Sequence, residues 1–314
     1  MKSGHTVNDL DAVTGLRAPL HLAVGMFDGV HLGHQAVVEA AIQSASRTWG
    51  VAGVLTFNPH PSRLFRPDQP TLLMMPFALK ASFLHYLGID WVIQQTFDAG
   101  FAAIEAERFP LVLKEKLPSL AALYVGENFR FGKKRSGTVA DLVRIAKTID
   151  VIVYSIERIK QNGQPISSTR IRDELVAGNI EAANNLLGYT YRSEGVVVPG
   201  KQIGRTIGFP TLNMRWDPEL KPRFGVYAVR VKLPREDRWL PAVANYGVRP
   251  TVSAADPQLP LLEVHLLGET SLVAGVELYV EWYYFIRPEQ KFASFDQLKA
   301  QIVEDKAMAQ QLLG

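Results

Sequence analysis

The segment over residues 20–46 joins an apolar run, Leu20 to Val24, to a helical pattern through a turn that contains three glycines. The turn spells out Gly25-Met26-Phe27-Asp28-Gly29-Val30-His31-Leu32-Gly33-His34. A buried strand that enters a helix through such a turn leaves the first N–H groups of the helix directed at whatever lies above the turn. The segment therefore predicts a strand–helix unit with a phosphate-binding site at its turn.

Two histidines strengthen this interpretation. His31 and His34 are three residues apart, so they share a face at the start of the helix and add imidazole donors to the positive end of its dipole. Gly25, Gly29 and Gly33 remove side chains that would keep a nucleotide from the backbone. The same residues also suit a tight turn with two surface histidines. A histidine pair can be half of a metal site as well, although no third ligand stands at a suitable spacing nearby.

The length of 314 residues favours two domains, and 47% apolar residues suffice for two cores. The absence of cysteine excludes a disulfide framework and thiolate chemistry. No apolar run approaches the ~18 residues of a membrane span. Residues 1–19 also lack an apolar signal core, so we expect a cytoplasmic protein without membrane contact. A net charge of +3 without a dense basic stripe gives nucleic-acid binding little support.

Short β-rich runs alternate with helical patterns from residue 20 to about residue 187. The pattern predicts further strands over 51–57, 91–95, 121–125 and 151–154, with helices over 77–87, 105–116 and 139–147. Such alternation is typical of a parallel sheet with helices on both faces. Ligands of these sheets bind beyond the carboxyl ends of the strands, which is where the first strand delivers His31 and His34.

Two further segments follow expected strands. Asn58-Pro59-His60-Pro61 comes directly after Phe57 and is stiffened by its prolines. Residues 126–137 combine two aromatic side chains, Phe129 and Phe131, with four cations between glycines. That composition suits a loop whose aromatic side chains stack on the ring of a ligand and whose cations bind its phosphates. Taken alone, the first segment is better explained as a proline-stiffened loop. For the second, a solvated basic loop is a common alternative.

A third segment, residues 166–172, begins a helix with Ser167 or Ser168 as its N-cap. A second helix N-terminus with hydroxyl groups and Arg172 could hold the outer phosphates of a nucleotide. Taken alone, the segment is better explained as an ordinary capped helix.

The strings FDGVHLGH, TFNPHP, VGENFRFG and ISSTRIR together resemble the adenylyltransferase domain of the bacterial bifunctional riboflavin kinase/FMN adenylyltransferases. These domains are α/β, Rossmann-like members of the HxGH nucleotidyltransferase superfamily. The resemblance implies that the FMN phosphate attacks the α-phosphorus of ATP, giving FAD and pyrophosphate without a protein nucleophile. It implies catalytic roles for His31 and His34. It further implies ATP contacts from Gly25, Phe27, Asp28, Gly29, His31, His34, Asn128, Ser168, Thr169 and Arg172, and flavin contacts from Asn58, Pro59, His60, Pro61, Phe129 and Phe131.

The periodicity changes after residue 188. A helical pattern over 173–188 ends at Gly188, which suits a helix C-cap and a domain boundary. Beyond it, Gly, Pro, Asn and Asp separate strand-like runs, and no long helix is expected before residues 295–313; the runs cover 191–198, 225–233, 240–246, 261–267 and 276–286. This pattern predicts a β-barrel with a C-terminal helix. We therefore expect domains over residues 1–187 and 188–314.

Two constellations in the second half carry chemistry. The stretch 200–213 holds three glycines and two cations ahead of Thr211 and Asn213, whose oxygens could bind Mg2+. The stretch does not match the GxxxxGK[ST] pattern of phosphate-binding loops, so the motif alone is weak evidence for phosphate binding. In residues 262–266, strand alternation places Glu263 and His265 on one face. Glu263 is a candidate general base, although a solvated edge glutamate is the commoner explanation.

The strings GFPTLN, GVYAV, NYGVRPT, LEVHLL and RPEQKFASFDQLKAQIVEDKAMA resemble the riboflavin kinase module of the same family. The resemblance implies that Thr211 and Asn213 hold Mg2+ and ATP, and that Glu263 takes the proton of the ribityl 5'-hydroxyl as it attacks the γ-phosphate. It places Lys201, Gly204 and Gly208 in the phosphate loop. Three positions on the flavin side depart from the family pattern: Val252, Gly268 and Val280.

These observations predict a bifunctional FAD synthase that uses ATP, Mg2+ and flavins. We expect a monomer or a weak homo-oligomer whose partners are small-molecule substrates. Two alternatives stay open. One is an FMN adenylyltransferase whose kinase domain has become a flavin-binding or regulatory module. The other is an adenylyl- or cytidylyltransferase for another phosphate acceptor.

Overall fold

The computed structural model of the protein describes residues 4–199, 208–234, 236–248, 260–268 and 275–314. Packing divides the chain into two compact units, Met1–Ser168 and Thr169–Gly314. The expected division between residues 187 and 188 stays a prediction. Within the described ranges, no helix is both long enough and apolar enough to cross a bilayer.

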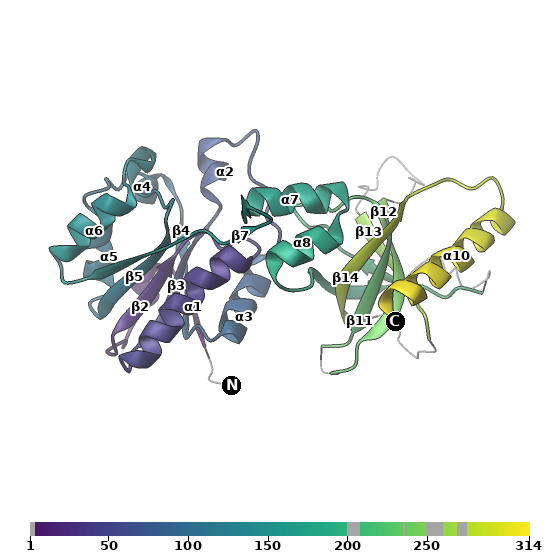
Figure 1. Cartoon of the computed structure of the whole chain (residues 1–314), viewed down its shortest axis with the longest axis horizontal. Helices are drawn as coiled ribbons and strands as arrows, with labels where there is room; N and C mark the ends of the chain where they lie inside the picture. Colours follow the sequence, from purple (N-terminus) through teal and green to yellow (C-terminus); the bar gives the residue numbers. More distant parts are fainter. Residues whose placement is uncertain (1–3, 200–207, 235, 249–259, 269–274) are drawn as a thin grey trace. The chain divides into compact units, whose positions relative to one another are not determined.

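The first unit is built on a parallel sheet of six strands, as the alternating pattern predicts (Figure 1). Its strands lie in the order β1-β4-β3-β2-β5-β6, with the bounds β1 His5–Asn8, β2 Leu20–Val24, β3 Val51–Asn58, β4 Trp91–Thr96, β5 Leu120–Gly126 and β6 Ile152–Ile156. Every residue of β2 is buried, because this apolar strand lies in the middle of the sheet. Strand β1 was not expected; it pairs with β4 at one edge, where His5 stacks on Trp91.

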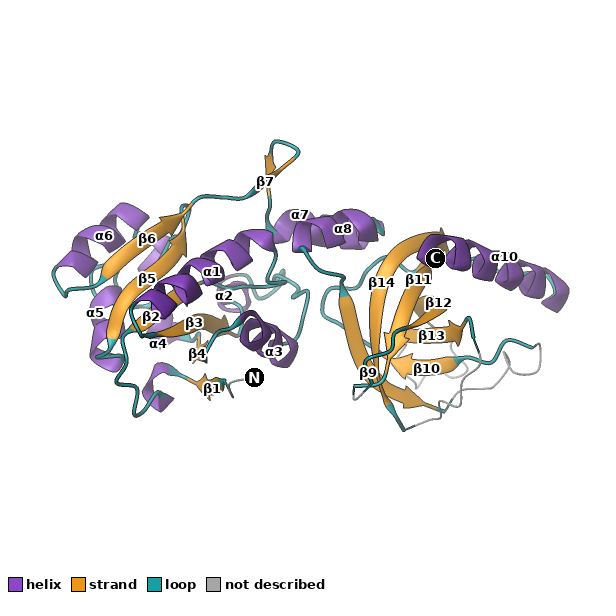
Figure 2. Ribbon diagram, turned by 60° about the horizontal axis from the view of Figure 1, so that its bottom comes forward, coloured by secondary structure: helices purple, strands orange, loops and turns teal. Residues whose placement is uncertain are grey.

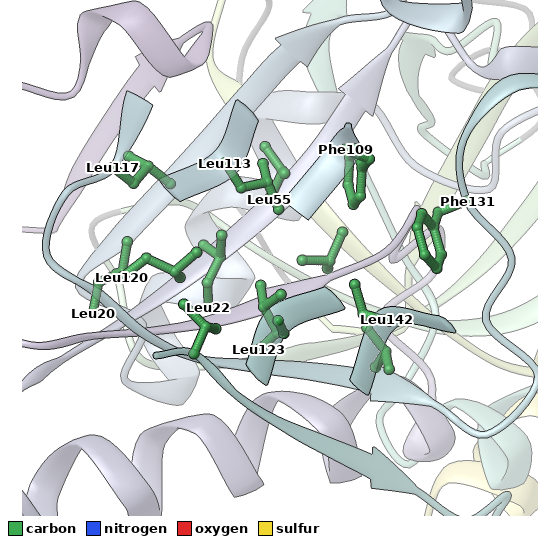
Figure 3. Packing of buried hydrophobic residues seen from close by; sticks show 14 of the residues in the cluster. Leu20, Leu22, Leu55, Phe109, Leu113, Leu117, Leu120, Leu123, Phe131 and Leu142 are labelled. Carbon is green, nitrogen blue, oxygen red and sulfur yellow. The ribbon is translucent and has the colours of Figure 1, made fainter. Parts of the chain in front are cut away.

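Helices cover both faces of this sheet (Figure 1). Their bounds are α1 Leu32–Arg47, α2 Pro61–Phe65, α3 Phe77–Leu87, α4 Ala99–Ala102, α5 Phe109–Lys116 and α6 Val139–Lys147. Leu20 and Leu22 of β2 pack with Leu113 of α5 and Leu142 of α6 in the core of one face (Figure 3). His21 points to the opposite face, where its Nε2 lies 2.8 Å from the Thr48 hydroxyl at the end of α1.

The helix expected over 105–116 begins only at Phe109. Pro110 occupies its first turn, where the missing N–H and the fixed φ of proline are tolerated, and this defines the start.

The strand order places a topological switch point between β2 and β5. From β2 the chain builds outward through β3 and β4 on one side, and then through β5 and β6 on the other. The chain therefore leaves β2 and β5 in opposite directions, and ligands of such sheets bind beyond the carboxyl ends of the strands at that point. The segments that follow β3, β2 and β5 lie side by side at this edge.

Two helices follow, α7 Ser168–Ala177, which belongs to the second unit from Thr169 onward, and α8 Ile180–Leu187. The single helical stretch expected over 173–188 is therefore wrong. Gly178 interrupts it with φ +86°, a left-handed conformation that a residue without Cβ adopts at little cost. Its N–H donates to the Leu175 carbonyl at 3.2 Å and ends α7. α8 ends at Gly188, which also has left-handed backbone angles.

A closed barrel follows, as expected, in the order β10-β13-β12-β11-β14-β9 (Figure 2). Its bounds are β9 Arg192–Val198, β10 Leu212–Arg215, β11 Gly225–Lys232, β12 Leu240–Val248, β13 Pro260–Leu266 and β14 Glu277–Pro288. The short β10 was not expected. It closes the barrel by pairing with both β13 and β9. A small hairpin, β7 Lys160–Gln161 and β8 Gln164–Pro165, precedes the second unit.

Side chains fill the barrel from inside and cover it from outside. Tyr227, Tyr246 and Trp282 are completely buried and their rings contact one another in the interior. The alternate residues of β11 face outward, where Val226 and Ala228 pack against the C-terminal helix α10, Phe295–Leu313. This helix has the expected bounds.

Candidate active sites

The turn after β2 is held in a strained backbone conformation. Phe27 has φ 49° and Val30 has φ 33°, both in the left-handed region that glycine favours. The two side chains are 1% and 0% exposed, so packing fixes the turn despite the strain. Asp28, 3% exposed, anchors its middle by accepting the Met74 N–H at 3.0 Å. Strain that the surroundings hold in place is typical of functional sites.

His31 is the N-cap of α1. Its Nδ1 accepts the His34 N–H at 3.3 Å, and the two imidazole rings stack with centroids 3.6 Å apart. Because a backbone N–H can only donate, Nδ1 is the acceptor, and the neutral ring carries its proton on Nε2. A Cβ on Gly33 would come within 3.2 Å of the His31 ring, which explains why a glycine lies between the histidines. The turn thus presents an Nε2–H donor and the positive end of a helix together.

Ile166 and Ser168, at the end of the first unit, lie against the same turn. The Ser168 hydroxyl donates to the Asp28 carbonyl at 3.2 Å, and the Ile166 carbonyl oxygen is 4.0 Å from a Cβ placed on Gly33. Of the predicted phosphate ligands, Ser168 is thus placed beside His31. Thr169 and Arg172 follow in α7, within the second unit.

The segment after β3 leaves Asn58 and Pro59 exposed. The imidazole of His60 is engaged locally, because its Nδ1 caps α2 by accepting the Ser62 N–H at 3.1 Å. Two aromatic side chains that our motif analysis missed lie next to this segment. Phe65 is 58% exposed and its ring meets Phe97 edge to face. Phe97 is half-buried and directly follows β4, so an aromatic residue immediately after a strand is the sequence signal that could have identified it.

The segment after β5 forms a turn in which the Phe129 N–H donates to the Gly126 carbonyl at 2.9 Å. Asn128 is exposed and Phe129 is half-buried. Phe131, by contrast, is 5% exposed and lies in the core with its ring 5.4 Å from that of Phe109. Phe131 therefore packs against the protein itself, and Phe129 is the more accessible ring of the two.

In the second unit, β10 and β12 flank β13 and bring polar side chains into register. Glu263 of β13 is the direct partner of Asn213 on β10 and of Asn245 on β12. Residues paired in this way share a face of the sheet. Leu262 and Val264, on either side of Glu263, are 0% exposed and point into the barrel. Asn213 and Glu263 consequently meet on the outer face, and Thr211 directly precedes β10.

His265 also lies on this outer face and holds the segment that precedes β10. Its Nδ1 is 2.8 Å from the Pro210 carbonyl, so Nδ1 carries the proton. Burial lowers the pKa of His265, which keeps the ring neutral. Its ring meets Phe209 edge to face, and the Lys306 ammonium of α10 lies over the Phe209 ring.

Several predicted kinase positions carry less structural information. Lys201, Gly204 and Val252 lie outside the described residues. Gly208 has φ +89°, which a side chain would strain. Gly268 is exposed, whereas Val280 is fully buried inside the barrel. The departure at Val280 is therefore a change in barrel packing.

The polar side chains around Glu263 offer oxygen atoms that could bind a divalent cation. Within the described part of the chain, no group of three or more His, Cys, Asp or Glu side chains is placed to bind a metal ion. Thr211, Asn213 and Glu263 offer hydroxyl, amide and carboxylate oxygens. Mg2+ prefers oxygen ligands and usually completes its shell with water and substrate phosphates.

Comparison with known proteins finds matches for both parts of the chain. A family model described as FAD synthetase matches residues 16–170, and one described as riboflavin kinase matches residues 187–313. The bifunctional riboflavin kinase/FMN adenylyltransferase of Escherichia coli K12 is 38% identical over 293 residues, covering 93% of this chain and 92% of the relative. The Bacillus subtilis protein of the same name is 33% identical over 315 residues, covering 98% and 97%.

A crystal structure described as that of a macrolide-efflux protein from Streptococcus pneumoniae superposes with a TM-score of 0.87 at 28% identity. The match covers 97% of this chain and 98% of that one, so the likeness extends over both units. The sequence relatives cover nearly the whole chain and carry one shared name. This chain belongs to the family of bifunctional riboflavin kinases/FMN adenylyltransferases.

Proposed function

We infer that this protein converts riboflavin to FAD in two ATP-dependent steps. The second unit phosphorylates riboflavin to FMN, and the first unit transfers AMP from ATP to FMN with release of pyrophosphate. The observation that carries this assignment is the presence of two separate polar sites in one chain. One is the His31 turn at the switch point of the parallel sheet, and the other is the Asn213–Glu263 pair on the barrel.

In the first unit, the geometry favours catalysis by positioning and by neutralisation of charge. The Nε2–H of His31 donates to a phosphate oxygen of ATP, and the ring of His34 is held beside it by stacking. The backbone of residues 25–29 lies along the triphosphate, with Asn128 at the nucleotide and Ser168 at the outer phosphates. For Thr169 and Arg172, which belong to the second unit, a role at the outer phosphates rests on the family resemblance alone. An oxygen of the FMN phosphate attacks the α-phosphorus, and pyrophosphate leaves with the bonding electron pair. Donors aimed at the charge that develops lower this barrier without a protein nucleophile.

The flavin of FMN is proposed to lie between the ends of β3 and β5. Asn58, Pro59 and Pro61 line one side, and Phe129 offers an aromatic ring on the other. Because the Nδ1 of His60 accepts the Ser62 N–H, we propose that His60 holds this segment in place and does not contact the flavin directly. Phe131 is not included, because its ring is buried in the core.

In the second unit, Glu263 accepts the proton of the ribityl 5'-hydroxyl while that oxygen attacks the γ-phosphorus of ATP, and ADP leaves. Thr211 and Asn213 would hold Mg2+ together with the ATP phosphates, and Lys201, Gly204 and Gly208 belong to the phosphate loop. When bound, the metal ion supplies neutralisation of the phosphate charge. His265 fixes the Pro210 carbonyl and with it the direction in which Thr211 enters the site.

We also propose that the modules divide between residues 187 and 188, which the end of one family model at residue 170 and the start of the other at 187 support. We further propose that the protein is a monomer or a weak homo-oligomer. Because both reactions consume ATP, we place the enzyme in the cytoplasm.

A chromatographic time course with riboflavin, ATP and Mg2+, repeated with FMN in place of riboflavin, tests this function. FMN followed by FAD is the expected product order. If only the FMN-fed reaction gives FAD, the second unit is a flavin-binding or regulatory module. If neither reaction gives FAD while another phosphomonoester consumes ATP, the acceptor of the first unit is not FMN.

A further inference from the structure

A lysine that belongs to no predicted site lies beneath the phosphate-binding turn. Lys80 is on α3 and is 7% exposed, although lysine is almost never found fully buried without a partner. Its ammonium donates to the Met26 carbonyl at 3.0 Å and to the Thr56 hydroxyl at 2.9 Å. Met26 belongs to the turn after β2, and Thr56 belongs to β3. One side chain thus connects α3 to both of the segments that flank the nucleotide site.

Thr56 completes this connection. Its hydroxyl donates to the same Met26 carbonyl at 2.9 Å, so the carbonyl accepts from two side chains that come from different elements. The next residue along the turn, Phe27, has φ 49°. A peptide that leads directly into a strained residue needs fixed partners, since otherwise the backbone relaxes to a commoner conformation. Lys80 and Thr56 supply such partners.

Burying an ammonium group is costly, so its position calls for a reason beyond packing. Burial lowers the pKa of Lys80 to about 8, and the Asp28 carboxylate opposes this shift. The Phe77 ring lies 5.7 Å from the ammonium. An uncharged side chain of similar length would fill the same volume without the desolvation cost. Such a side chain would, however, neither donate a hydrogen bond to the turn nor place a positive charge beneath the phosphate site.

We propose that Lys80 is a positioning residue for adenylyl transfer, which holds the Met26 carbonyl so that the turn presents its N–H groups and His31 to the phosphates of ATP. The proposal rests on the function assigned to the first unit. Lys80 acts through the turn and makes no contact with the reacting atoms in this account. Its loss should therefore impair FAD formation and leave riboflavin phosphorylation, in the other unit, unchanged.

The test compares Lys80→Met with Lys147→Met, the same change at an exposed helical lysine of the same unit. We expect Lys80→Met to lower kcat/KM for ATP in FAD formation by about 10²-fold, the loss typical of reacting groups misplaced by ~1 Å. Its melting temperature should be lower, because removing one partner leaves the buried Asp28 carboxylate without the ammonium that faces it. The rates are therefore compared at a temperature at which circular dichroism shows both variants to be folded. Lys147→Met should match the wild type in both measurements.

A second variant covers the case in which Lys80→Met does not fold. Thr56→Val keeps the shape of the side chain and removes the hydroxyl that joins Lys80 to the Met26 carbonyl. It should lower FAD formation several-fold while riboflavin phosphorylation stays at the wild-type rate. Wild-type kcat/KM for ATP in a folded Lys80→Met protein, or in Thr56→Val if that variant alone folds, overturns the role of Lys80. Wild-type protein that forms no FAD from FMN contradicts the proposed function itself.

Discussion

Asn213 on β10 and Glu263 on β13 are direct partners across two antiparallel strands. The pairing places an amide and a carboxylate on the outer face of the barrel, while their neighbours Met214 and Leu262 are completely buried. Because cross-strand partners stay within contact distance of each other, the two side chains share one site. This arrangement supports our proposal that Asn213 binds the metal ion and that Glu263 is the general base of phosphoryl transfer to a hydroxyl group.

Glu263→Gln should abolish most of the riboflavin kinase activity. The amide keeps the size of the side chain but cannot accept the proton of the ribityl hydroxyl. We expect FMN formation to fall by about 10²- to 10⁴-fold, the usual contribution of a general base. The measurement is the initial rate of FMN formation by chromatography. Glu277→Gln, at an exposed position of β14, is the matched control and should have no effect. Equal rates in Glu263→Gln and the wild type would remove Glu263 from the mechanism.

Two substitutions of His31 separate capping from catalysis. Asn can accept the His34 N–H as an N-cap, whereas Ala cannot. Both His31→Asn and His31→Ala should lower FAD formation by about 10²- to 10³-fold, since both lose the Nε2–H donor. Only His31→Ala should also lose about 1 kcal/mol of unfolding free energy in urea. Riboflavin phosphorylation is the internal control. FAD formation at the wild-type rate by His31→Asn is the result that this account does not allow.

His265 should act on the kinase site through Pro210. His265→Phe removes the donor to the Pro210 carbonyl, a bond that contributes about 1 kcal/mol. We expect KM for ATP in riboflavin phosphorylation to rise several-fold, because Thr211 follows Pro210 directly. His265→Asn places an amide donor near the position of Nδ1 and should restore most of the affinity. Initial rates at varied ATP concentration measure the effect. An unchanged KM in His265→Phe shows that the bond does not position Thr211.

Stability should fall in mild acid because two buried histidines are neutral. Burial lowers the pKa of His21 in the first unit and of His265 in the second. In the unfolded chain both rings take up a proton near pH 6.5, whereas in the folded state they do so only at lower pH. The unfolded state therefore binds more protons below about pH 6.5, and the unfolding free energy decreases as the pH falls through this window.

Unfolding curves at about pH 7.5 and about pH 5.5, on either side of the ordinary histidine pKa, measure this loss. His21→Gln removes one titrating group and should reduce the difference between the two curves. A wild-type protein that is equally stable at both pH values contradicts the prediction.

Local patterns were sufficient to predict most elements of this fold. The helices over Phe77–Leu87, Val139–Lys147 and Phe295–Leu313 have the expected bounds, because apolar periodicity and end signals lie within each segment. The break at Gly178 was missed because the helical pattern continues on both sides of it. Strands β1 and β10 are each four residues long, too short for periodicity to distinguish them from loops.

The candidate sites likewise contain residues that local sequence patterns predict and residues that only tertiary contacts bring together. His31, Gly33 and His34 were predictable because the chemistry lies within one turn. Lys80 was not, since from the sequence it is one polar residue on a helix, and its burial is set by Met26 and Thr56 from distant elements. The Asn213–Glu263 pair depends on the register of a closed barrel, which no local pattern reveals. The core position of Phe131 likewise depends on its contact with Phe109.

The most direct test of two independent active sites combines the variants His31→Asn and Glu263→Gln. Each is incubated with riboflavin, ATP and Mg2+, alone and mixed, and flavins are separated by chromatography. We predict that His31→Asn alone stops at FMN, that Glu263→Gln alone leaves riboflavin unchanged, and that the mixture forms FAD. If folded His31→Asn also fails to make FMN, or if folded Glu263→Gln carries riboflavin to FAD, the assignment of one reaction to each unit is contradicted.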